Sequence, residues 1–150
     1  KEFFTHPEGE IGKIKTLFKT TVCLCKGLTI NLNYNGENIS YYSSNGLNDL
    51  VDDAVKTTEL IDKRFSINYV ENKNKLDMIL TYTSNYSSTV VPYVNTGLTE
   101  RGPHITQIKT IITREFNKFF REKKWLKDKD ENLTGDDIQE GMYIAFHITD

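Results

Sequence analysis

Three basic side chains on one expected helix are the residues of this sequence best suited to bind an anion. Arg114, Lys118 and Arg121 follow one another at spacings of four and three residues, which places them on one helical face. Further lysines follow directly, namely Lys123, Lys124, Lys127 and Lys129. Such a stripe can contact the phosphates of DNA, and that contact weakens steeply with salt. The alternative interpretation is a solvated outer face with cations that favour a helix C-terminus.

The sequence holds no recognisable set of residues for catalysis or for binding a metal ion. The glycines are scattered and build neither a G-x-G-x-x-G pattern nor a Walker A phosphate cradle. Two carboxylate pairs, Asp52 with Asp53 and Asp136 with Asp137, consist of neighbours whose side chains point in different directions on a helix. We interpret them as solvated faces or helix-start charges. We therefore expect no catalytic residue and no metal site in this chain.

His104 is the histidine of most interest, because it stands where residues 101–103 lead into the longest expected helix. No Ser/His/Asp or Cys/His set can be assembled around it. We interpret it as a residue that caps the helix or anchors the loop through its ring nitrogens. His147 lies out of phase with the apolar residues of the last expected strand, so we place it on the opposite face of the sheet.

The elements that carry these residues follow from the spacing of apolar side chains. The basic stripe lies opposite an apolar stripe on the same helix, which consists of Ile105, Ile108, Ile112, Phe116 and Phe119. Trp125 and Leu126 end this helix. Thr134, with Asp137 three residues later, is typical of a helix start. A closing strand is predicted over residues 142–148, where apolar and polar residues alternate.

Earlier in the chain, helices and strands alternate. Helices are predicted over residues 11–25 and 47–55, and the first of them ends at Lys26 and Gly27. Strands are predicted over residues 28–34, 39–42, 65–69, 78–82 and 86–95. The first two strands form a hairpin, because Asn-Gly at positions 35 and 36 is a tight-turn dipeptide. Pro92 indicates an edge strand or a bulge.

Length and composition place these elements in one domain. A chain of 150 residues can fold alone, so we expect a single domain over residues 1–150. Its class is α+β, with one mostly antiparallel sheet and helices packed on one face. Charge is nearly balanced, with 19 Lys+Arg against 21 Asp+Glu, so any contact with nucleic acid must be local. The sequence shows no apolar run that could span a membrane and no signal peptide.

The N-terminal segment carries less information. Lys1 stands in place of an initiating methionine, which indicates a piece of a longer polypeptide, and residues 1–7 are expected to form an entry strand or linker. Cys23 and Cys25 lack further cysteine or histidine ligands at suitable spacing. We interpret them as reduced cysteines in the core of a cytosolic protein or at its boundary.

A string near the C-terminus is too particular for composition to explain. Residues 130–137 read Asp-Glu-Asn-Leu-Thr-Gly-Asp-Asp, and Glu140 and Gly141 follow. This string resembles the transducer domain of the ATP-binding subunit of type IIA DNA topoisomerases, the family of gyrase B and its topoisomerase IV counterpart in bacteria and phages. The resemblance extends over most of the chain through the segments at 14–30, 41–47 and 80–95. One departure is Arg-Gly-Pro-His at residues 101–104, where that family usually has Gly-Gly-Thr-His.

The resemblance implies a fold and a set of site residues. The fold would be similar to domain 2 of ribosomal protein S5, with a mixed sheet. A structural motif would comprise Gly102, His104, Asn132, Thr134, Gly135 and Asp137. Arg114, Lys118 and Arg121 become candidates for contacting double-stranded DNA. The domain would relay ATP-driven dimer closure to the DNA gate during strand passage.

The resemblance also implies partners and cofactors. The partners would be double-stranded DNA, a second ATPase subunit and the DNA-cleaving topoisomerase subunit or domain, in a cytoplasmic, nucleoid-associated enzyme. The parent enzyme would use ATP and Mg²⁺, but a Gln-Thr-Lys loop that contacts the γ-phosphate would follow Asp150, so we expect the isolated fragment to be inactive. The alternative function is a non-catalytic nucleic-acid- or protein-binding module with the same fold, of ribosomal or mismatch-repair type.

Overall fold

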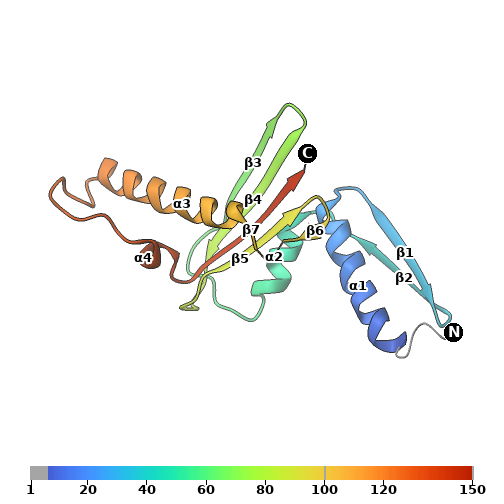
Figure 1. Cartoon of the computed structure of the whole chain (residues 1–150). Helices are drawn as coiled ribbons and strands as arrows, with labels where there is room; N and C mark the ends of the chain where they lie inside the picture. Colours follow the sequence, from blue (N-terminus) through green and yellow to red (C-terminus); the bar gives the residue numbers. More distant parts are fainter. Residues whose placement is uncertain (1–6, 100, 150) are drawn as a thin grey trace. The chain divides into compact units, whose positions relative to one another are not determined.

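The computed structural model describes residues 7–99 and 101–149, which belong to two compact units (Figure 1). The first unit is Lys1–Ala54 and the second is Val55–Asp150. Of the expected entry segment, residues 1–6 lie outside the described residues, and Pro7 already belongs to a helix. In the described part of the chain, no helix is long and apolar enough to cross a membrane. That residues 1–150 form one transducer domain stays a prediction.

The first unit consists of a long helix, a hairpin and the greater part of a second helix. Its elements are α1 (Pro7–Leu24), β1 (Thr29–Tyr34), β2 (Glu37–Tyr42) and most of α2 (Leu47–Val55). β1 and β2 pair antiparallel, and the turn between them has positive φ at Asn35 (50°) and Gly36 (82°). Positive φ at both central residues defines the hairpin turn that Asn-Gly favours. Both predicted helices and the predicted hairpin are confirmed.

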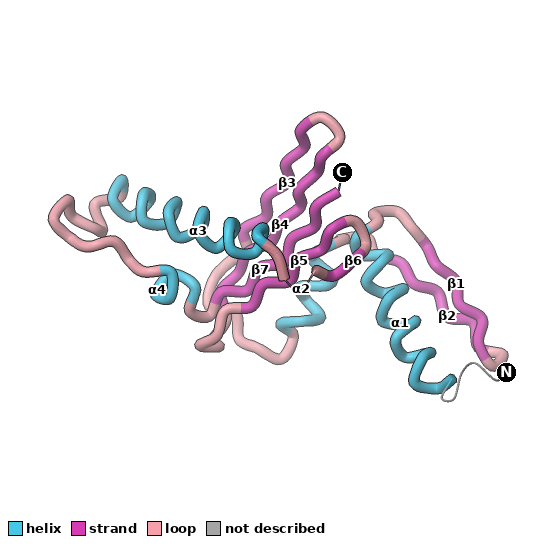
Figure 2. The backbone as a smooth tube through the Cα atoms, viewed as in Figure 1, coloured by secondary structure: helices cyan, strands magenta, loops and turns pink. Residues whose placement is uncertain are grey.

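The second unit contains a five-stranded sheet and a helical crossover, which Figure 2 shows leaving the sheet and returning to it. Its elements are β3 (Phe65–Glu71), β4 (Asn74–Tyr82), β5 (Thr89–Val94), β6 (Gly97–Leu98), α3 (Pro103–Glu122), α4 (Gly135–Gln139) and β7 (Met142–Thr149). The strand order is β3-β4-β7-β5-β6, and every pairing is antiparallel except that of β5 with β7. Parallel strands need a crossover connection, and here α3 and α4 provide it.

The α+β class with a mixed sheet is confirmed, but the strands divide between two sheets where one was expected. β1 and β2 form a two-stranded sheet of their own. Alternation of apolar and polar residues predicts that a segment is a strand. It does not predict which strands pair, because pairing depends on the packing of neighbours in the folded chain.

The core of the second unit lies between the sheet and α3. It joins the buried residues Leu80, Ile112, Ile138, Met142, Ile144 and Phe146. Burying one such side chain stabilises the fold by about 1.5–3 kcal/mol. Ile108 and Phe116 of the predicted stripe pack against this core, whereas Phe119 keeps 43% of its surface exposed and contacts Trp125 with ring centroids 5.8 Å apart. Because the apolar stripe faces the sheet, the basic residues on the other side of α3 face away from it.

Pro92 lies in a strand that has a neighbour on each side and a continuous register with β7, so the prediction of an edge strand or a bulge is wrong. β5 pairs with β7 on one side and with the two-residue strand β6 on the other. The Pro92 carbonyl accepts a hydrogen bond from the N–H of Thr99 at 2.9 Å. In a strand, the nitrogen and the carbonyl of one residue point to the same side, so the Pro92 nitrogen also faces away from β7. On that side, the two residue pairs that join β5 to β6 involve Tyr93 and Val94 and do not include Pro92. The missing N–H therefore interrupts no hydrogen bond to β7.

His147 lies on the sheet face opposite Phe146, as its phase predicts. The register places it between Asp77 of β4 and Tyr93 of β5. The side chain is buried, and its Nε2 lies 2.6 Å from the carbonyl oxygen of Asn95. A carbonyl only accepts, so the ring N–H donates. His147 thereby holds the first residue after β5.

Candidate nucleic-acid interface

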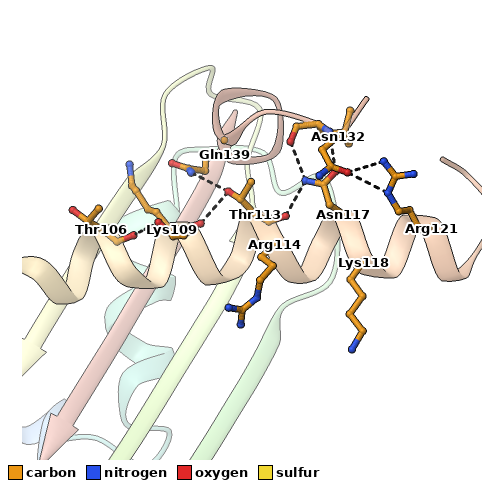
Figure 3. A pocket seen from close by; sticks show the side chains of 12 residues that line it. Thr106, Lys109, Thr113, Arg114, Asn117, Lys118, Arg121, Asn132 and Gln139 are labelled. Atoms are coloured by element: carbon orange, nitrogen blue, oxygen red, sulfur yellow. Dashed lines mark hydrogen bonds between the residues drawn. The ribbon is translucent and has the colours of Figure 1, made fainter. Parts of the chain in front are cut away.

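A groove lies along the side of α3 that carries the basic residues (Figure 3). Its volume is about 930 Å³. One wall is α3, and the other is formed by the loop that follows α3 and by α4. The lining residues are Thr106, Lys109, Thr110, Thr113, Arg114, Asn117, Lys118, Arg121, Asn132, Leu133, Gly135 and Gln139. We call this feature the cationic groove.

Four of the residues that line the cationic groove are positively charged, and none of them is acidic. Lys109 joins the three basic residues that the sequence indicated. Its Nζ donates to the Ser88 hydroxyl at 3.0 Å, and this neutral partner leaves the charge of the lysine in place. The sequence reasoning missed Lys109, because a spacing of five residues from Arg114 breaks the three-four pattern. A concave surface with charge of one sign attracts ligands of the opposite sign.

Arg114 and Lys118 are the exposed cations of the groove, and their side chains point away from Asn132 in Figure 3. Arg114 forms an ion pair with Glu115, with Nη2 to Oε1 at 2.8 Å, and Lys118 lies 4.0 Å from Glu122. All four side chains are at least half exposed. Exposed pairs of this kind contribute about 0–1 kcal/mol. A phosphate can therefore replace either glutamate at little cost.

Arg121 differs, because its guanidinium is engaged inside the chain. It donates four hydrogen bonds: Nε and Nη2 to Oδ1 of Asn132 at 3.2 and 2.7 Å, Nη1 to the Lys127 carbonyl at 2.9 Å, and Nη2 to the Asp130 carbonyl at 2.8 Å. A guanidinium has five N–H donors, so one remains. All three predicted basic residues line one groove. Arg121 differs from Arg114 and Lys118 because its partners are the loop backbone and Asn132, and not a neighbouring glutamate.

Asn117 is a groove residue that the sequence reasoning missed. Its side-chain amide is buried and pairs with the backbone of Leu133: Nδ2 donates to the carbonyl at 2.9 Å, and Oδ1 accepts from the N–H at 2.8 Å. Nδ2 also donates to the Thr113 carbonyl at 3.0 Å. The only signal in the sequence is its residue type, because an asparagine in the interior of a helix is unfavourable without a specific partner.

Thr134 and Asp137 begin α4 with reciprocal hydrogen bonds. The Thr134 hydroxyl accepts from the Asp137 N–H at 3.2 Å, and the Asp137 carboxylate accepts from the Thr134 N–H at 2.8 Å. This capping box confirms the predicted helix start. The hydroxyl of Thr134, and then its N–H, hold the pKa of Asp137 below its ordinary value. A Cβ on the next residue, Gly135, would lie 3.2 Å from Nε2 of Gln139, the end of a flexible side chain.

Gly102 and His104 form the entry of α3 by packing. Gly102 is the N-cap residue, and no side chain caps the helix there. Its φ is 157°, and a Cβ at this position would overlap the His104 ring. That ring contacts Phe146 edge to face at 5.9 Å, and its buried Nε2 has no hydrogen-bond partner in the described part of the chain. The expected helix cap is therefore absent, and His104 fixes the entry through contact with the core.

The fold defines the class of this protein as an α+β domain of the kind found in gyrase B. The 43K ATPase domain of Thermus thermophilus gyrase B, solved in complex with an aminocoumarin, superposes with a TM-score of 0.78 over 92% of this chain and 39% of that chain, at 22% identity. The topoisomerase IV ATP-binding domain of Francisella tularensis gives a TM-score of 0.71 over 99% of this chain and 40% of that chain, also at 22% identity. These identities make the likeness one of fold.

The chain belongs to the DNA gyrase B family. The family model described as DNA gyrase B matches residues 46–149. The B-subunit of DNA topoisomerase 4 from Streptococcus pneumoniae is 27% identical over 97% of this chain, and that from Bacillus subtilis is 31% identical over 83%. The chain spans only 23% and 20% of the lengths of these relatives. The resemblance to the gyrase B family is confirmed, whereas the role of transducer domain stays a prediction.

Proposed function

We propose that this chain is the transducer of a type II DNA topoisomerase of bacterial or phage type. In this function it relays ATP-driven closure of the subunit dimer to the DNA gate during strand passage. The observation that supports the proposal is the cationic groove, which lies on a helix packed on the sheet in a chain of the DNA gyrase B family. A relay requires an element that moves as a rigid body. The packing of α3 on the sheet provides such an element.

In this proposal Arg114 and Lys118 contact the phosphates of double-stranded DNA. Both side chains are exposed, and their glutamate partners lie in weak surface pairs. Lys109 contributes a third positive charge at the other end of the groove. Contacts to phosphates position a protein on duplex DNA without reading its sequence, which suits an enzyme that passes one duplex through another.

The remaining chemistry is assigned to the parent enzyme. ATP and Mg²⁺ would bind in its nucleotide-binding domain, and DNA cleavage would occur in the partner subunit or domain. Within the described residues, no group of three or more His, Cys, Asp or Glu side chains could hold a metal ion. We assign residues 7–99 and 101–149 no catalytic side chain, and a second ATPase subunit would complete the dimer.

The test is charge reversal in the full-length enzyme. Arg114→Glu with Lys118→Glu is expected to lower the rate of strand passage about tenfold or more, because each reversed charge repels a phosphate that it would have bound. ATP hydrolysis without DNA is expected to remain, since that chemistry lies in another domain. Strand passage is measured by relaxation, supercoiling or decatenation of circular DNA.

A matched control carries the same change in net charge outside the groove. Lys63→Glu with Lys73→Glu alters two exposed lysines of the second unit that do not line the groove. This variant is expected to keep the strand-passage rate of the parent enzyme. If the groove variant also keeps that rate, Arg114 and Lys118 do not contact the transported DNA and the proposal loses its support.

A further inference from the structure

We propose that Arg121 is a positioning residue, which builds the wall of the cationic groove and does not itself bind a phosphate. It acts through Asn132 and through the backbone of the loop between α3 and α4. That the ligand is the phosphate backbone of duplex DNA rests on the proposed function. The wall itself rests only on hydrogen bonds within the chain.

The loop begins with a fixed helix end. The N–H of Lys124 donates to the Arg121 carbonyl and that of Trp125 to the Phe120 carbonyl, each at 2.9 Å. Lys124 adopts a φ of 60°, and the rings of Trp125 and Phe120 lie 5.6 Å apart. Together these features form a Schellman motif with its hydrophobic contact. The direction in which the chain leaves α3 is therefore determined.

Arg121 holds the middle of the loop. Residues 127–130 form a turn in which the Asp130 carboxylate accepts from the Lys127 N–H at 2.7 Å and the Asp130 N–H donates to the Lys127 carbonyl at 3.0 Å. The guanidinium of Arg121 then spans this turn and reaches Asn132. The side chain of Arg121 thus bonds to the first and last residues of the turn and to Asn132, two residues after it.

The loop ends in contacts of the same kind. Asn117, one helical turn before Arg121, pairs with both backbone groups of Leu133. The capping box of Thr134 follows at once. Asn132 and Leu133 are themselves lining residues of the groove. Arg121 and Asn117 therefore hold the wall of the groove at a fixed distance from α3.

The composition of the loop shows why its conformation matters. Residues 123–132 contain four lysines and three carboxylates, which gives a net charge of 4 − 3 = +1. A flexible segment of this composition would present both signs to a phosphate. The carboxylate of Asp130 is turned to a backbone N–H, which a fixed loop makes possible. Ordering such a segment before binding also removes an entropic cost of binding.

The experiment compares two variants of the full chain that disturb the wall with one that removes a contact. Arg121→Lys keeps the charge but replaces the planar fork by an ammonium, which cannot make these four bonds. Asn132→Ala removes a neutral acceptor. Arg114→Gln is the matched contact variant. Each is measured for affinity to a short duplex as a function of salt, and for amide hydrogen exchange of Lys127 and Leu133.

Arg121→Lys and Asn132→Ala are expected to weaken duplex binding about three- to tenfold while the slope of log affinity against log salt stays nearly constant. Exchange of the Lys127 and Leu133 amides rises in both, whereas Ile144 in β7 keeps its protection, which excludes global unfolding. Arg114→Gln lowers the magnitude of the salt slope by about one and leaves exchange unchanged.

The proposal is overturned if Arg121→Lys and Asn132→Ala keep full affinity while Arg114→Gln weakens binding, because Arg121 would then act as a simple positive charge. It is equally overturned if the loop amides keep their exchange rates in both variants. If exchange rises but no variant, Arg114→Gln included, alters DNA binding, the positioning role is supported and the proposed function fails. The two proposals therefore fail by different measurements.

Discussion

At the scale of single residues, Arg114 and Arg121 show how two arginines of one helical face can differ in their partners. Both are arginines of α3 and both line the cationic groove. Arg114 pairs with an exposed glutamate next to it in sequence, whereas Arg121 donates four hydrogen bonds to residues 127–132. A guanidinium with one remaining donor cannot offer a phosphate its two-pronged contact. The availability of donors, more than charge, separates the two residues.

Gly141 offers a residue-scale test of the link between α4 and the sheet. Its φ is 71°, and a Cβ there would lie 2.5 Å from the carbonyl oxygen of Thr83 and 2.8 Å from that of Asn85. Both atoms belong to backbone and cannot rotate away. Gly141→Ala is therefore expected to lower the free energy of unfolding by at least about 2 kcal/mol, as measured by urea denaturation.

Gly97 provides the control for this substitution. A Cβ at Gly97 would lie no closer than 3.6 Å to the Val94 carbonyl, which is an ordinary contact, and its φ is not positive. Gly97→Ala should change the free energy of unfolding by less than about 0.5 kcal/mol. Equal effects of the two substitutions would mean that the space around Gly141 is not limiting.

At the scale of elements, the sequence predicted the helices and strands well because each has a periodic signal. The apolar stripe of α3, the alternation in β7 and the Thr134–Asp137 start of α4 all appear in the structure where they were expected. The loop of residues 123–133 has no period. Its path depends on Arg121 and Asn117, whose side chains bond to backbone groups many residues away. Such contacts exist only in the folded chain.

The start of α4 makes a prediction about pH. Hydrogen bonds from Thr134 hold the pKa of Asp137 below its ordinary value of 3.8, so the folded pKa is lower than the unfolded one. The stabilisation is therefore present above about pH 4 and is lost as the pH falls through the folded pKa. Carboxylates titrate between about pH 5 and pH 2, and the parent chain should lose the stabilisation from Asp137 in this range. Asp137→Asn should lose less stability over the same range, as measured by the midpoints of urea denaturation.

Asp136 is the matched control, because it is also an exposed aspartate in the first turn of α4. It takes no part in the capping box. Asp136→Asn removes a charge from the same turn but leaves both hydrogen bonds of the capping box, so the loss of stability that Asp137→Asn removes should remain. If both substitutions alter the pH profile equally, the charge at the helix start matters and the hydrogen bonds of Thr134 do not.

The candidate site was only partly predictable for similar reasons. Spacing along one helix predicts which residues share a face, and it placed Arg114, Lys118 and Arg121 together correctly. Lys109 belongs to the same groove because of Ser88 and α4, which lie far from it in sequence. The hydrogen bonds between Arg121 and Asn132 also depend on the path of the loop after α3, which brings Asn132 back to the helix. Periodicity carries no information on either contact.

At the scale of the whole molecule, the family match and the groove fall in the same part of the chain. The DNA gyrase B family model matches residues 46–149, and the second unit begins at Val55. All lining residues of the groove lie in that unit. The chain as a whole has a net charge of −2, so its overall field does not favour DNA. The proposed binding of DNA therefore requires a local arrangement of charge.

This conclusion can be tested with two variants of equal net charge. Arg114→Glu with Lys118→Glu and Lys13→Glu with Lys26→Glu each change the net charge from −2 by −4, to −6. The groove variant should bind a short duplex at least about tenfold more weakly at low salt, with a salt slope smaller by about two, because two phosphate contacts are lost. The variant in the first unit should keep both quantities nearly unchanged, since Lys13 and Lys26 do not line the groove. Equal losses in the two variants would show that net charge governs binding and that the groove does not.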